Sequence, residues 1–149
     1  MRLSDNFTMA ELTKSQTAER MSIDNSPKSD DEIINLKSLC ENILEPVREE
    51  FGIPFSPSSG YRCMGLNRAI GSSDNSQHVK GEAVDFEIPG IPNLEVAQWI
   101  MDNLDYDQLI LEFYKEEDPS SGWIHCSYLE DGNRNVARRF DGRNWNDLS

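Results

Sequence analysis

The sequence predicts an α+β fold in which helices pack on one face of a mostly antiparallel sheet. Helical periodicities dominate the first third of the chain, whereas segments with strand-like patterns lie mainly after residue 80. Helices that precede strands, instead of alternating with them, are typical of this class. Because a chain of 149 residues buries a sizeable core, we expect one domain over residues 1–149, with an N-terminal helical segment at about 6–52.

The helical signals begin near the N-terminus. The segment TMAE, residues 8–11, has the pattern of a capping box, and a second short helix follows in QTAERM. Ser29 and the acids after it predict the start of a long amphipathic helix that ends at Gly52. Pro46 lies inside this helix and lacks a backbone N–H, so we expect a kink near Asn42. Shorter helices are predicted in MGLNRAIG and IPNLEVAQWIMDNLD.

The strand signals have apolar side chains on alternate residues or in short continuous runs. EAVDFEI places Val84 and Phe86 on one face and Asp85 on the other. QLILEFY and WIHCSYL are apolar and are separated by the polar KEEDPSSG, which predicts antiparallel neighbours. We expect an edge strand in IPFSPSSGYR, where prolines interrupt the pattern, and a last edge strand in RNVARRFDG before a polar tail.

Composition argues against several classes of partner. The formal net charge of −13 and the scattered basic residues disfavour a nucleic acid. No apolar run approaches the roughly 18 residues of a membrane span, so we expect no membrane partner. The N-terminus lacks the apolar core of a secretory signal, which predicts synthesis in the cytoplasm without a signal peptide. The three cysteines match neither a disulfide framework nor a CxxC metal site, so we expect reduced core thiols. We also expect the protein to be a monomer.

Three residues have the chemistry of a catalytic zinc site, which uses three protein ligands and leaves one position open. His78 and His125 are the two histidines of the chain, and Asp85 follows His78 by seven positions. Gly81 permits a tight reversal that would point His78 and Asp85 to one side. Alternation in WIHCS turns Cys126 away from His125. Such spacing also arises by chance, in which case His78 is an exposed loop residue and His125 a half-buried strand residue.

The string SQHVKGEAVDF resembles the S-x-H-x-x-G-x-A-x-D signature of a family of zinc peptidases. This family includes D-alanyl-D-alanine carboxypeptidases, phage L-alanyl-D-glutamate endopeptidases and the hedgehog signalling domain. SSGYR and WIHCS resemble its other two landmarks, in the family's order across residues 58–127, and the segment from Asn6 onward is similar to phage-type members.

The resemblance implies a hedgehog-like fold and one Zn²⁺ with the ligands His78, Asp85 and His125. It also implies that Arg62 orients the substrate or stabilises an oxyanion. A guanidinium suits this role because it holds a carbonyl or carboxylate by paired hydrogen bonds, although Arg62 could also be a plain surface arginine. Further candidate substrate contacts are Tyr61, Ser76 and Trp123, each of which could instead serve packing.

The general base is harder to place by resemblance. Many family members carry an acid three residues before the last histidine ligand, where this chain has Gly122. Members similar to hedgehog carry a glutamate at the end of the preceding strand, where ILEF offers Glu112. Strand parity allows Glu112 to lie on the same face as the histidine. Glu116, Glu117 and Asp118 in the connecting loop are the competing candidates.

These residues predict a zinc metallopeptidase that hydrolyses peptide bonds in peptidoglycan stem peptides, as a carboxypeptidase or an endopeptidase. The resemblance places its action at the cell wall, after phage-mediated release or as part of a virion. The alternative is a binding module of the same fold that contains zinc and has lost turnover, which the glycine at position 122 keeps open.

Overall fold

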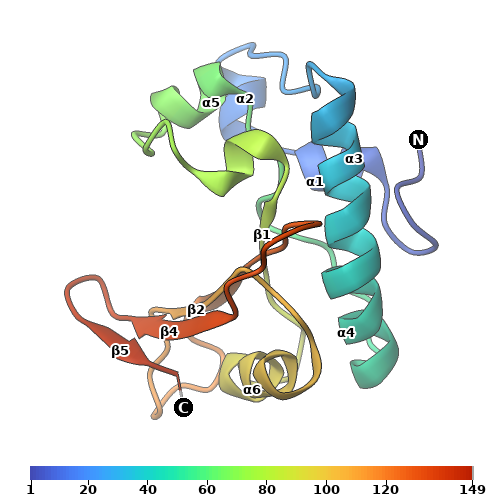
Figure 1. Cartoon of the computed structure of the whole chain (residues 1–149). Helices are drawn as coiled ribbons and strands as arrows, with labels where there is room; N and C mark the ends of the chain where they lie inside the picture. The colour runs from blue at the N-terminus through green and yellow to red at the C-terminus, as the bar shows by residue number, and fades with distance from the viewer. Residues whose placement is uncertain (149) are drawn as a thin grey trace.

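A computed structural model describes residues 1–148 and contains a five-stranded sheet in the order β1-β3-β2-β4-β5. Figure 1 shows the sheet below α5, with the long N-terminal helix beside it. β2 and β4 run parallel, and the other neighbouring pairs are antiparallel. The predicted α+β class with a mostly antiparallel sheet is therefore confirmed. The strands are β1 Ala83–Phe86, β2 Gln108–Glu112, β3 Trp123–Ser127, β4 Val136–Phe140 and β5 Trp145–Asp147.

The N-terminal helices begin where the sequence predicts. Thr8 and Ser29 each form a complete capping box, with Glu11 and Glu32 respectively. The proline expected to kink the long helix lies in the turn after a π-helical segment that contains Asn42, and the Glu45 N–H donates to the carbonyl five residues earlier. The N-terminal elements are α1 Met9–Thr13, α2 Gln16–Arg20, α3 Asp30–Leu39, η1 Cys40–Leu44 and α4 Glu45–Phe51.

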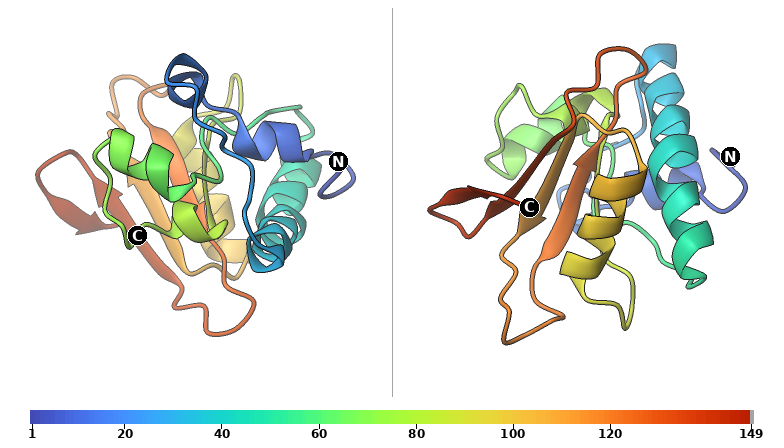
Figure 2. Two further views of the ribbon diagram at one scale, coloured as in Figure 1. Left: turned by 90° about the horizontal axis from the view of Figure 1, so that it is seen from above. Right: turned by 60° about the horizontal axis from the view of Figure 1, so that its bottom comes forward.

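Three further helical elements surround the sheet. They are α5 Met64–Ala69, the 3₁₀ turn η2 Gln77–Lys80 and α6 Asn93–Asn103. Helix α6 packs against β2 and β3 on the face of the sheet that enters the hydrophobic core, as Figure 2 shows. The turn η2 contacts β1, and its buried His78 approaches the opposite face. No helix within residues 1–148 has the length and apolar character that crossing a membrane requires.

The alternation of burial assigns a role to each face of the sheet. Leu109 and Leu111 of β2 are buried in the core, whereas Ile110 and Glu112 of the same strand are partly exposed on the other face. His125 belongs to this second face because it is paired directly with Ile110. The second face therefore carries the polar residues that the sequence singled out. All three cysteines are free and buried, as expected of core thiols.

Two predicted strands differ from the structure. IPFSPSSGYR forms no strand, and only Ser59 makes an isolated bridge to Asp85 of β1. The prolines of this segment, Pro54 and Pro57, cannot donate to a ladder, which explains its lack of regular pairing. The strand predicted in RNVARRFDG is present as β4. It does not form the edge of the sheet, because β5, from the tail expected to be polar and unpaired, pairs with it.

Candidate metal centre

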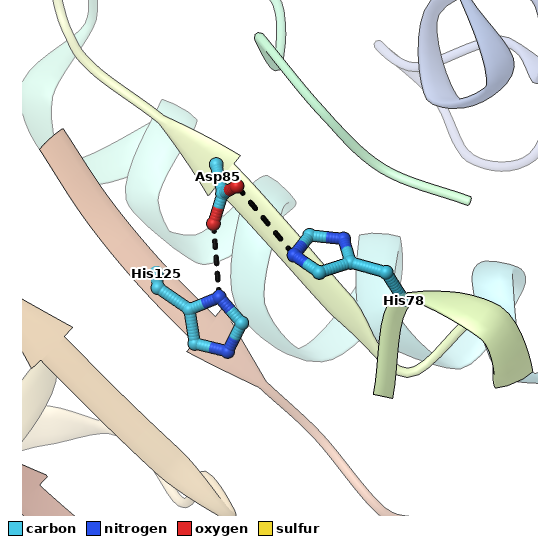
Figure 3. A group of neighbouring side chains, drawn as sticks. All are labelled: His78, Asp85 and His125. Carbon is cyan, nitrogen blue, oxygen red and sulfur yellow. Dashed lines mark hydrogen bonds and ion pairs between the residues drawn. The ribbon is translucent and has the colours of Figure 1, made fainter. Parts of the chain in front are cut away.

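Three side chains from three segments converge on the polar face of the sheet. The Asp85 carboxylate of β1 lies between the imidazoles of His78 from η2 and His125 from β3, as Figure 3 shows. His78 Nε2 is 3.5 Å from Asp85 Oδ2, and His125 Nδ1 is 2.9 Å from Asp85 Oδ1. The side chains are buried to different degrees, with 3% of His78, 17% of Asp85 and 15% of His125 exposed. The group is thus accessible to solvent mainly through Asp85 and His125.

The backbone of η2 orients His78. Ser76 caps this turn by accepting a hydrogen bond from the His78 N–H, and Gly81 ends it in the left-handed conformation with φ of 77°. A Cβ at position 81 would approach the Glu32 carbonyl oxygen to 2.8 Å, so a larger residue does not fit there. Gly81 therefore makes the reversal that the sequence suggested, and it lets η2 pack directly against α3.

A carbonyl oxygen sets the tautomer of His78. His78 Nδ1 lies 2.7 Å from the carbonyl oxygen of Gly60, which can only accept a hydrogen bond. Nδ1 therefore carries a proton, and Nε2 is the ring nitrogen that faces Asp85 and that a neutral His78 would offer to a metal ion. A ligating histidine commonly has its other ring nitrogen bonded in this way, which fixes the ring and raises its basicity.

The segment at residues 58–62 binds the backbone around both His78 and Asp85. The Ser58 N–H donates to the Asp85 carbonyl at 2.9 Å, and the Asp85 N–H donates to the Ser59 carbonyl at 2.8 Å. The Arg62 N–H donates to the His78 carbonyl at 3.1 Å. This segment therefore holds η2 and β1 at a fixed separation.

Gly60 is required at the centre of this segment for a steric reason. A Cβ there would lie 2.4 Å from the carbonyl oxygen of Leu12, and the next residue, Tyr61, donates its N–H to that same oxygen at 2.7 Å. Asn25, which is 8% exposed, clamps the following residues by accepting from the Cys63 N–H and donating to the Tyr61 carbonyl. Asn25 lies in a segment with only loop signals, so its role cannot be predicted from the sequence.

The three side chains fit a Zn²⁺ ion. Donors about 2.0–2.1 Å from a tetrahedral zinc lie roughly 3.3 Å apart, and each histidine lies within 3.5 Å of one of the two carboxylate oxygens of Asp85. All three donors lie within 4.8 Å of one another. Burial opposes ionisation of Asp85, but hydrogen bonds from His125 and His78 outweigh it and lower the pKa of Asp85. Two imidazoles and an ionised carboxylate are a donor set typical of catalytic zinc.

Arg62 lies close to this group. Its guanidinium donates to Ser76 Oγ at 3.3 Å, and its Nε is buried without a hydrogen-bond partner in the described part of the chain. Burial lowers the pKa of Arg62, while the nearby charges of Asp85 and Glu112 raise it. Arg62 as a whole is partly exposed, and a guanidinium is suited to pair with an oxygen atom of a substrate.

Glu112 is half-buried at the end of β2, on the same face as His125. Its Oε2 accepts a hydrogen bond of 2.8 Å from the Trp123 indole N–H. Burial raises the pKa of Glu112, and the charge of Asp85 adds to this effect, while His125, the Trp123 hydrogen bond and Arg62 oppose it. A carboxylate in such surroundings is suited to accept and release a proton.

The competing acids in the loop after β2 have other partners or lie in solvent. Glu116 accepts a hydrogen bond from Arg139 at 2.8 Å, Asp118 bonds to Ser120, and Glu117 is exposed. None of the three is among the charges that act on Arg62 or Asp85. Of the candidate acids, Glu112 is the one that the fold brings to the metal centre.

Gly122, where the resemblance led us to look for an acid, is constrained by the backbone around it. Gly122 adopts a φ of 70°, and a Cβ there would lie 1.9 Å from the carbonyl oxygen of Glu112. Asn93, at the start of α6, donates to the Gly122 carbonyl at 3.1 Å and holds this close approach. No side chain, acidic or otherwise, fits at position 122 with this backbone.

The three candidate substrate contacts differ in their positions. Tyr61 is 2% exposed and its hydroxyl donates to Glu32, so its ring packs in the core. The Ser76 hydroxyl accepts hydrogen bonds from the His78 N–H and from the Arg62 guanidinium, so it orients both of these residues. Trp123 is partly exposed, and its polar atom is engaged by Glu112.

A comparison with protein families matches the chain to the family Peptidase M15 over residues 5–127. The chain therefore belongs to the peptidase M15 family. Its members are zinc-dependent peptidases, in agreement with the histidine, aspartate and histidine cluster. A search of the curated proteins finds no match.

We expect the protein to bind one Zn²⁺ through this cluster. Asp85→Asn replaces an ionised ligand with a neutral one and should weaken zinc affinity at least about 100-fold, since even the loss of a residue that supports a ligand costs 10–100-fold. Competition with a chromophoric chelator measures the affinity. Asp102→Asn, at an exposed aspartate on α6, is the matched control and should leave the affinity unchanged. Equal affinities for the two variants would contradict the assignment.

The close approach at Gly122 predicts that an alanine there destabilises the protein more than an alanine at Gly132, a second glycine of positive φ. The Cβ that Gly132→Ala adds meets no atom within 4 Å. This variant should therefore lower the free energy of unfolding by only about 1–2 kcal/mol, because alanine disfavours the left-handed backbone. Gly122→Ala adds a clash with the Glu112 carbonyl, so we expect its loss of unfolding free energy to exceed that of Gly132→Ala by at least about 1 kcal/mol. Urea unfolding monitored by circular dichroism gives both values, and equal losses would show that Gly122 is not sterically constrained.

Proposed function

We propose that this protein is a zinc metallopeptidase that cleaves peptide bonds in peptidoglycan stem peptides. The observation that carries the proposal is a half-buried carboxylate, Glu112, on the same sheet face as His125 and close enough to interact with Asp85 and Arg62. The proposal is supported by a candidate proton acceptor, a cation and a candidate metal site that lie close together. We further propose that the protein acts as a monomer at the cell wall, after phage-mediated release or as part of a virion.

The catalytic roles follow from the chemistry of each side chain. Zn²⁺ held by His78, Asp85 and His125 would supply a Lewis acid that polarises the substrate carbonyl and lowers the pKa of a water molecule toward ~7. Glu112 accepts the proton of the attacking water on a carboxylate oxygen and passes it to the nitrogen of the leaving amine. The Trp123 hydrogen bond holds Oε2 of Glu112, which leaves Oε1 free for the proton. Arg62 pairs its guanidinium with the carbonyl oxygen as negative charge develops there.

The surroundings of the centre support an endopeptidase over a carboxypeptidase. A hollow of about 280 Å³ beside Ser59 and Arg62 lies on one side of the Asp85–His125 pair, and a groove of about 140 Å³ beside Ile110 lies on the other. Space on both sides accommodates residues before and after the cleaved bond. Mass spectrometry of purified murein digested by the zinc-loaded protein identifies the bond. Release of a terminal D-alanine alone would contradict the endopeptidase assignment.

The role of Glu112 separates an enzyme from a binding module that contains zinc. Glu112→Gln should lower kcat at least about 100-fold, as expected for loss of a general base, while zinc affinity stays within about threefold of the wild-type value. Glu117→Gln, in the exposed loop nearby, is the matched control and should keep wild-type kcat. Full activity in Glu112→Gln would refute the assignment, and a wild-type protein without turnover would favour the binding module.

The indole of Trp123 should act through Glu112. Trp123→Phe keeps an aromatic ring and removes the N–H donor, so we expect kcat to fall about tenfold, equivalent to about 1.4 kcal/mol, with KM changed less than about twofold. Trp99→Phe, on α6 behind the core face of the sheet, is the matched control. Steady-state kinetics on the same peptide substrate separates the two constants. A rise in KM at constant kcat would instead make Trp123 a substrate contact.

A further inference from the structure

The sheet face that holds the metal centre continues into the C-terminal strands. Along one row across the sheet, Asp85 is paired with His125, His125 with Ile110, and Ile110 with Arg138 of β4. Directly paired residues on neighbouring strands share a face. Arg138 therefore lies on the face of His125, two strands away, with about 10 Å between their Cα atoms.

A groove of about 140 Å³ lies at this end of the row. Ile110 and Val136 supply apolar surface, and Trp145 of β5 forms an aromatic wall that is 50% exposed. The guanidinium carbon of Arg138 is 5.9 Å from the centre of the Trp145 ring. The remaining lining residues are Gln108 and Arg134. The groove thus combines an apolar floor with a cation held over an aromatic ring.

The two arginines of the groove differ in their partners. Arg134 is neutralised by the buried Asp107, which accepts two hydrogen bonds from its guanidinium at 2.9 and 2.7 Å. Arg138 is exposed and makes no ion pair within 4.0 Å anywhere in residues 1–148, although Asp147 is its strand partner. In a chain with a net charge of −13, a cation without a carboxylate partner leaves its donors free for a ligand.

We propose that Arg138, Ile110 and Trp145 form a substrate subsite selective for a carboxylate. An acidic residue of the peptide packs its aliphatic part on Ile110 against Trp145 and pairs its carboxylate with Arg138. An extended peptide advances about 3.3 Å per residue, so this residue lies roughly three positions from the cleaved bond. The subsite rests on the proposed function, since its ligand is the peptide cleaved at the metal centre. β4 and β5 lie beyond residues 5–127, which the family matches, so the subsite is an addition to the shared catalytic unit.

Two synthetic stem peptides test the subsite, identical except that the glutamate carboxylate is free in one and amidated in the other. We expect the zinc-loaded wild type to prefer the free acid at least about tenfold in kcat/KM, a typical value for a charged hydrogen bond. Arg138→Gln should abolish this preference, and Arg138→Lys should retain part of it because the charge remains. Arg143→Gln, an exposed arginine in the β4–β5 turn, should keep the full preference. Circular dichroism confirms that each variant is folded.

The outcomes separate this proposal from the proposed function. Arg138→Gln with the wild-type preference, or with an equal loss on both peptides, would overturn the subsite. If the wild type cleaves neither peptide, the proposed function fails. Binding of the two peptides to the same proteins, measured by calorimetry, then tests the subsite separately. The subsite is supported if the wild type binds the free acid more tightly than the amide and Arg138→Gln removes this difference. Equal binding of the two peptides, or no binding, overturns it.

Discussion

The arrangement depends on one buried carboxylate, Asp85, which lies between two imidazoles. Withdrawing a carboxylate from water is costly unless donors or a cation compensate it. Here the compensation comes from η2 and β3, which are separated in sequence by more than 40 residues. Asp85 also pairs its backbone with the Ser58–Ser59 segment. A single residue therefore couples three segments, and a divalent cation would strengthen this coupling by binding to all three side chains.

The precision of the centre comes from close backbone contacts. Gly60 and Gly81 each lie against a carbonyl oxygen that a Cβ would clash with or crowd. The Gly60 contact brings its own carbonyl onto His78 Nδ1, and the Gly81 contact seats η2 on α3. Gly122 obeys the same rule just before β3, where a Cβ would clash with the carbonyl oxygen of Glu112. Glycine in this protein thus determines where the catalytic groups stand by allowing backbones to meet.

The sheet separates stability from chemistry by the parity of its strands. In β2, Leu109 and Leu111 belong to the hydrophobic core, while Ile110 and Glu112 face the metal centre. The same parity continues into β4 and β5, which extend the polar face beyond the part of the chain that the family matches. The C-terminal segment also contributes to the core through Ala137 and Leu148, so it continues both the apolar and the polar face of the sheet.

The sequence by itself determined the fold class, the helix starts at Thr8 and Ser29, the three candidate ligands and the choice of Glu112. These features depend on local capping, periodicity and ordered motifs, which are visible within short windows. The tertiary structure alone decided the Gly60 carbonyl bond to His78, the clamp by Asn25, the burial of Tyr61 and the position of β5. Each of these depends on a close approach between distant segments, and neither periodicity nor spacing encodes which backbones will meet.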